Sequence, residues 1–168
     1  QALEAIVNRE RDIQHALSAS LLDEPGYDMY LQYQPIYDIG SKAVVGFEAL
    51  ARLKTQDLGS VSPVEFIPIA EKTKLIIPLG YRIIEQSFRF LQTLQAYGHD
   101  DVSVSINISA IQLLGGDFTD NLQRMIREKG IDPESVNLEI TESILAMNYQ
   151  EINEILGRLQ ALGISIAI

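Results

Sequence analysis

A carboxylate and a guanidinium stand close together in the otherwise apolar stretch of residues 46–52, GFEALAR. In an extended strand the side chains alternate between two faces, so Glu48 and Arg52 point the same way as Leu50. A charged pair on such a strand costs free energy unless its face meets water, a metal or an anion. Carboxylate oxygens are hard ligands for Mg²⁺ or Mn²⁺, and a guanidinium binds phosphate through a planar fork of donors. The stretch therefore fits a site for metal and phosphate, with the wet face of an edge strand as the alternative.

Two later segments carry the same kind of polar face. In 102–108 and in 136–141 one face is aliphatic and the other polar, and the polar faces include Asn107 and Glu139. Strands that helices cover on both sides are usually continuous apolar runs. A closed barrel with helices outside would instead bring Glu48, Asn107 and Glu139 to its mouth, where barrel enzymes place their chemistry. Oxygen donors without His or Cys favour Mg²⁺ or Mn²⁺. A sheet with one solvated face is the alternative.

The composition limits the chemistry of this chain. Its 168 residues suffice for one domain, and 46% apolar against 21% charged residues is typical of a globular protein. The absence of Cys excludes thiolate chemistry, and only two His disfavour a Ser-His-Asp triad. A net charge of −10 argues against a nucleic acid polymer as partner and requires metal ions beside any bound phosphate ester. No membrane span or signal peptide is predicted, so we expect a cytoplasmic chain without direct membrane contact, unless another region of the parent protein anchors it.

The elements that position these side chains alternate along the sequence. Periodicity predicts strands at Met29–Ile36, Ala43–Leu53, Val102–Ile108, Val136–Ile140 and Ile164–Ile168. Helices are predicted from Ser62 to about Lys72 with a bend at Pro68, from Pro78 to Gly98, from Asp117 to Gly130, and from Asn148 to Gly163. Capping boxes are expected at Ser62 to Glu65 and at Asn148 to Glu151, and a cap at Asp117. Repeated strand–helix units predict a parallel sheet.

The first helix has a separate interpretation. Residues 3–22 place apolar side chains at helical spacing before a break at residues 23–26. We interpret residues 1–26 as a linker helix from an upstream domain that lies outside the barrel as a connector or homodimer contact. Residues 27–168 then form the domain itself. A helix packed on that domain is the alternative.

Five blocks of this sequence resemble, in order and spacing, successive blocks of the EAL domain, which hydrolyses the bacterial second messenger cyclic di-GMP. The blocks are Tyr33-Gln34-Pro35-Ile36 and residues 48–52, 62–71, 107–113 and 138–143. The resemblance runs from about Tyr30 to Ile168. It implies an α/β fold, a TIM-like (β/α) barrel whose first strand is antiparallel, here truncated after about five strands.

The resemblance also implies roles for single residues. Glu48, Asn107 and Glu139 would bind the Mg²⁺ or Mn²⁺ ions of a two-metal phosphodiesterase, with Glu48 catalytic. Gln34 and Arg52 would hold cyclic di-GMP, and Leu50 would line its groove. Glu142, counted with the catalytic residues, resembles a glutamate that steadies a neighbouring loop. A parent protein with an upstream sensory or GGDEF-type domain is implied.

The end of the chain qualifies the expected activity. In the family an Asp-Asp pair follows the strand that ends at Ile168, and a catalytic Lys comes later, so we expect residues 1–168 to be the N-terminal portion of the domain and inactive alone. A non-catalytic, EAL-like receptor for cyclic di-GMP or for a protein partner is the first alternative. A glycoside hydrolase with Glu139 as the acid is the second, disfavoured because the chain has no Trp.

Overall fold

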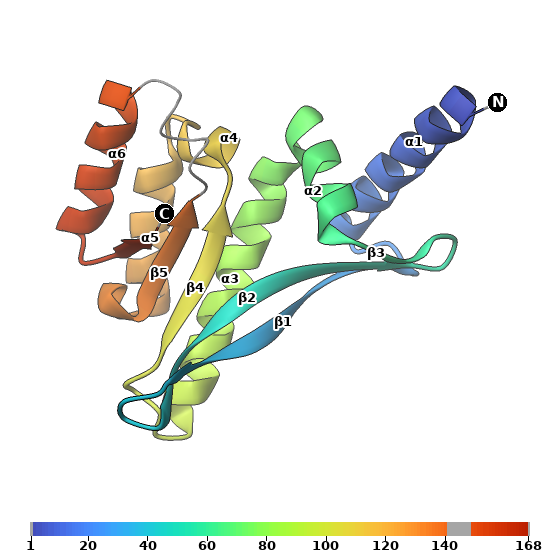
Figure 1. Cartoon of the computed structure of the whole chain (residues 1–168). Coiled ribbons are helices and arrows are strands. Elements are labelled where there is room, and N and C mark those ends of the chain that lie inside the picture. Colours follow the sequence, from blue (N-terminus) through green and yellow to red (C-terminus); the bar gives the residue numbers. More distant parts are fainter. Residues whose placement is uncertain (1, 141–148, 168) are drawn as a thin grey trace.

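One mixed sheet organises the computed structural model, which describes residues 2–140 and 149–167. Within these residues the sheet has six strands: β1 Tyr27–Asp38, β2 Ala43–Thr55, β3 Gly59–Val61, β4 Ser103–Ile108, β5 Val136–Ile140 and β6 Ser165–Ala167. The strand order is β1-β2-β4-β5-β6, and the short β3 pairs with β2 (Figure 1). β1 runs antiparallel to β2, whereas β2, β4, β5 and β6 are mutually parallel. The predicted mixed α/β sheet with an antiparallel first strand is confirmed.

Helices cover the aliphatic face of this sheet. They are α1 Ala2–Leu21, α2 Pro63–Lys72, α3 Ile76–Ala96, α4 Ala110–Leu113, α5 Phe118–Lys129 and α6 Tyr149–Ala161, with a 3₁₀ helix at Pro133–Ser135. α3 packs across β1, β2 and β4, and α6 contacts β6 (Figure 1). Val104, Ile106 and Leu138 are almost completely buried and join the helices in one apolar core. Because side chains alternate, the polar residues of the same strands lie on the opposite face.

The first helix is divided between packed and exposed halves. Ile13 and Leu17 are fully buried, and α1 contacts β1 and α2. Towards the N-terminus, Leu3, Ile6 and Val7 are exposed, and α1 projects beyond the sheet (Figure 1). The second half therefore packs on the domain, and the role of α1 as a linker stays a prediction. In the part of the chain that the structure describes, no helix is long and apolar enough to cross a membrane.

The expected capping box at Ser62 is wrong. Ser62 is the N-cap of α2, but its side chain makes no capping hydrogen bond. The Glu65 carboxylate instead accepts hydrogen bonds from Arg9 of α1, at 2.7 Å from Nε and 3.1 Å from Nη2. This contact lowers the pKa of Glu65 and raises that of Arg9. Pairing with another helix has replaced the local cap.

Other boundaries differ by a few residues. α3 begins at Ile76 rather than near Pro78, whereas α2 ends at Lys72, as predicted, and includes Pro68. The Asp117 side chain makes no capping bond, whereas Gly130 ends α5 at a φ of 63°, as a left-handed C-cap does. The capping box expected from Asn148 falls partly outside the described residues. β3 and α4 were not predicted, because elements of three and four residues carry almost no periodic signal.

Candidate active site

Three strands bring the predicted oxygen ligands to one face of the sheet. Asn107 of β4 and Glu139 of β5 are register partners, and Glu48 of β2 faces Ser105, one pleat before Asn107. The Asn107 side chain reaches across this step, and its Nδ2 donates a hydrogen bond of 3.0 Å to Glu48 Oε1. The prediction from strand alternation is confirmed in this respect, since both carboxylates lie on the same side of the sheet.

The donor atoms on this face suit a hard cation. The hydrogen bond from the Asn107 amide nitrogen uses only Oε1 of Glu48. Oδ1 of Asn107 and the second carboxylate oxygen of Glu48 take no part in it. Glu139 is half-buried, and its carboxylate makes no hydrogen bond or ion pair with the described residues. Oxygen donors of this kind are those that Mg²⁺ and Mn²⁺ prefer. Among the described residues no three His, Cys, Asp or Glu side chains form a metal-binding group, so the set consists of two carboxylates and one amide.

Arg52 lies on the same face of β2, and its guanidinium is oriented by two acceptors. Nε donates to Gln32 Oε1 at 2.8 Å, and Nη1 donates to the Ala51 carbonyl oxygen at 2.9 Å. Neither acceptor is charged, and no carboxylate within the described ranges pairs with Arg52. Its positive charge is therefore available to an anion. Gln32 was not predicted as a site residue, although it shares its face of β1 with Gln34.

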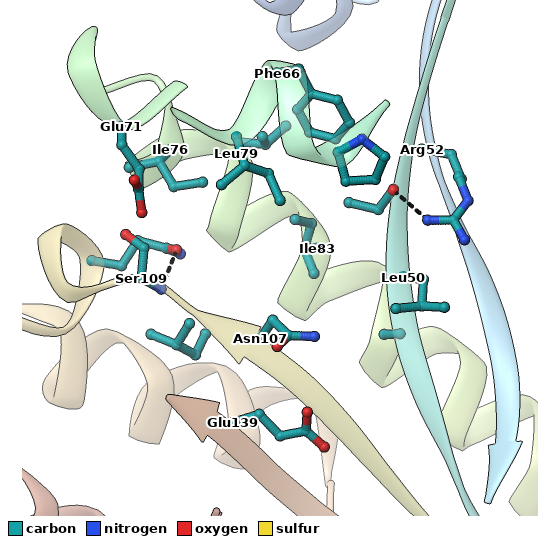
Figure 2. Close-up of a pocket in the computed structure, with 16 residues that line it drawn as sticks. Leu50, Arg52, Phe66, Glu71, Ile76, Leu79, Ile83, Asn107, Ser109 and Glu139 are labelled. Atoms are coloured by element: carbon teal, nitrogen blue, oxygen red, sulfur yellow. Dashed lines mark hydrogen bonds between the residues drawn. The ribbon is translucent and has the colours of Figure 1, made fainter. Parts of the chain in front are cut away.

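A cavity of about 340 Å³ opens beside these residues (Figure 2). From the strands it is lined by Leu50, Arg52, Asn107 and Glu139, while α2 and α3 contribute mainly apolar side chains, among them Phe66, Ile67, Ile76, Leu79 and Ile83. Two predicted residues lie outside this lining. Glu48 borders it through its bond to Asn107, and Gln34 is the exposed register partner of Glu48 on β1. The expectation that all five polar residues line one cavity is thus met by Arg52, Asn107 and Glu139. Glu142 falls outside the described residues.

The loop after β4 supplies a wall that sequence reasoning did not identify. Ser109 and Gln112 both line the cavity, and the Ser109 backbone N–H donates to Gln112 Oε1 at 3.1 Å. Gln112 is buried against Gly80 of α3, where an added Cβ would collide with Gln112 Nε2. The missing side chain at position 80 thus allows Gln112 to fix this loop. The spacing of Ser109 and Gln112 is a capping-box signal that could have predicted the contact.

Fold and site together define a TIM-barrel-like α/β domain with candidate ligands at the carboxyl ends of its parallel strands. In a comparison with protein-family models, residues 10–168 match the family described as "EAL domain". The chain belongs to the EAL domain family.

Known relatives extend beyond this chain. It is 38% identical over 146 residues to the biofilm architecture maintenance protein MbaA of Vibrio cholerae, covering 87% of this chain and 18% of that protein. It is 33% identical over 153 residues to the cyclic di-GMP phosphodiesterase PA2567 of Pseudomonas aeruginosa, covering 91% of this chain and 26% of the relative. The chain therefore spans about a quarter or less of these two proteins.

Solved structures show the same fold. The structure described as "PaMucR Phosphodiesterase, c-di-GMP complex" superposes with a TM-score of 0.86 at 29% identity, covering 94% of this chain and 62% of that one. The EAL enzyme Bd1971, in its form bound to cAMP and cyclic di-GMP, gives a TM-score of 0.84 at 30% identity, over 99% of this chain and 44% of that one. These similarities confirm the TIM-barrel-like EAL fold over the part that is shared.

Proposed function

We propose that this chain carries a cyclic di-GMP site and that the protein to which it belongs hydrolyses cyclic di-GMP to linear di-guanylate. The observation that carries the proposal is that one cavity is lined by Arg52, which has no carboxylate partner among the described residues, and by Glu139, which has no cationic partner among them. Arg52 would bind a phosphate of the dinucleotide, and Glu139 would face the cation beside it. Relatives named as cyclic di-GMP phosphodiesterases, and a solved relative in complex with this nucleotide, support the choice of ligand.

Arg52 is suited to a phosphate because it is already oriented. Gln32 and the Ala51 carbonyl oxygen already hold the guanidinium in place. Binding of a phosphate therefore costs little side-chain conformational entropy at Arg52. The Nη2 group is not used in these two bonds and is free to donate to an anionic oxygen in a charge-assisted bond. Leu50 and Gln34 would contact the rest of the ligand from β2 and β1.

Glu48, Asn107 and Glu139 would hold Mg²⁺ or Mn²⁺ in this site. When bound, the cation supplies the positive charge that an acidic protein lacks and activates the water that attacks phosphorus. Glu48 of β2 and Glu139 of β5 present carboxylate oxygens on the same face of the sheet, on either side of Asn107 of β4. The Asn107 amide keeps Glu48 in place through the 3.0 Å hydrogen bond. We extend the proposal to Glu142, which would support the adjacent loop.

Residues 1–168 on their own are expected to act as a non-catalytic receptor for cyclic di-GMP. The described residues bring together two carboxylates and one amide, fewer ligands than a two-metal clamp uses. We therefore expect residues 1–168 to bind cyclic di-GMP without turning it over. Incubation with Mn²⁺ followed by chromatography decides this point, since linear di-guanylate would form only if the essential groups all lie in this chain.

Calorimetric titration of cyclic di-GMP tests the binding site itself. Arg52→Ala should weaken binding by at least about tenfold, as expected for the loss of a charged hydrogen bond. Arg89→Ala removes a cation from the exposed surface of α3, where Arg89 pairs with Glu85, and should leave the affinity unchanged. Equal affinity for the wild type and Arg52→Ala would remove Arg52 from the site.

A further inference from the structure

Glu71 of α2 lines the cavity and has no side-chain partner among the residues that the structure describes. Figure 2 shows it at the opposite end of the cavity from Arg52. Other charged residues of α2 are paired with α1, since Glu65 accepts from Arg9 and Lys72 donates to Glu10 at 2.9 Å. The Glu71 carboxylate, by contrast, makes no hydrogen bond or ion pair within residues 2–140 and 149–167.

The surroundings of Glu71 make this lack of a partner informative. The side chain is half-buried, and the aliphatic side chains of Ile76 and Leu79 lie between it and Arg52 (Figure 2). A carboxylate that is partly removed from water and unpaired costs free energy, which a ligand with hydrogen-bond donors would recover. Apolar walls with a few polar groups at defined points are typical of small-molecule sites. The cavity thus has an anion-binding end at Arg52 and a donor-binding end at Glu71.

We propose that Glu71 determines nucleobase specificity by reading a guanine of cyclic di-GMP; the proposal rests on the function proposed above. Guanine presents two adjacent donors, N1–H and the N2 amino group, and a carboxylate has two oxygens that accept both. Adenine presents one donor and one acceptor on the same edge, so its N1 would face a carboxylate oxygen with no proton between them. With the phosphate on Arg52, Glu71 would accept from guanine, and the aliphatic side chains would contact the faces of the base.

The test is a change of base preference in Glu71→Gln. An amide offers one donor and one acceptor, which matches adenine and mismatches guanine. We would titrate residues 1–168 with cyclic di-GMP and with cyclic di-AMP in the presence of Mg²⁺, following backbone amide shifts by NMR, which detects millimolar binding. Glu71→Gln should bind cyclic di-GMP about tenfold more weakly and cyclic di-AMP more tightly than the wild type does.

The control and the contrary outcomes separate this proposal from the function on which it rests. Glu128→Gln makes the same change of charge at an exposed position of α5 and should keep the wild-type preference. If Glu71→Gln keeps the wild-type ratio of the two affinities, or weakens both equally, Glu71 does not read the base. If the wild type itself binds no cyclic di-GMP at millimolar concentration, the proposed function is overturned and the role of Glu71 with it.

Discussion

The contact between Gly80 and Gln112 gives the sharpest stability prediction. In an ordinary helix, Gly→Ala stabilises by about 1 kcal/mol, because Ala has the higher helix propensity. At position 80 of α3 the new Cβ would occupy the place of Gln112 Nε2 and force that buried side chain to move. Displacement breaks the bond from the Ser109 N–H, which costs about 1–3 kcal/mol when a buried group loses its partner, and overpacking adds about 1–3 kcal/mol. We expect Gly80→Ala to destabilise the chain by about 1–5 kcal/mol after the propensity gain is subtracted.

Urea unfolding of two matched variants provides the assay. Gly157 lies in α6, and a Cβ there would meet no other atom within 4 Å, so Gly157→Ala should stabilise by about 0.5–1 kcal/mol. In a Gln112→Ala background the collision is absent, and Gly80→Ala should cease to destabilise, which a double-mutant cycle measures as coupling. Equal stabilisation by Gly80→Ala and Gly157→Ala would refute the packing described for the loop after β4.

Three further predictions follow from other contacts. In a protein that contains the whole EAL domain, Glu48→Ala should abolish hydrolysis of cyclic di-GMP, as measured by chromatography, because a cation ligand is lost; retention of most activity would show that β2 is wrongly assigned. The pKa of Glu65 is lowered from 4.5, mainly by the hydrogen bond from Arg9. The ionised carboxylate therefore stabilises the folded chain fully above pH 4.5, and this contribution is lost as the pH falls through the lower pKa of the folded state. Glu65→Gln should therefore flatten the acid limb of a stability–pH curve, and an unchanged slope would contradict the pairing. On α1, Ile13→Ala should cost about 2–4 kcal/mol in thermal or urea unfolding, whereas Ile6→Ala at 58% exposure should cost less than about 0.5 kcal/mol; similar losses would contradict the division of the helix.

The strands and their polar faces could be predicted from sequence because alternation carries the signal directly. Val104, Ile106 and Leu138 define the buried face, and alternation then places Asn107 and Glu139 together on the other face. Helix ends that depend on distant partners could not be predicted in this way. The local sequence predicts Glu65 to be part of a helix cap. Its carboxylate instead accepts a hydrogen bond from Arg9, which is 56 residues away in the sequence.

The cavity was the least predictable feature. Its apolar wall comes from α2 and α3, and the sequence pattern of these helices predicts only that their apolar residues belong to the hydrophobic core. The loop after β4, which also lines the cavity, depends on the space that Gly80 leaves for Gln112. Gln32 was missed because its role depends on register: it faces Leu50 across the β1–β2 pair, close enough to accept from Arg52. Such contacts between elements are set by tertiary packing and not by local periodicity.

A crystal structure with cyclic di-GMP and Mn²⁺ tests the central claim most directly. We expect an anomalous manganese peak contacted by Glu48, Asn107 and Glu139, with a phosphate of the nucleotide on the Arg52 guanidinium. Manganese bound away from these three side chains, or a nucleotide whose phosphates do not contact Arg52, would contradict the account.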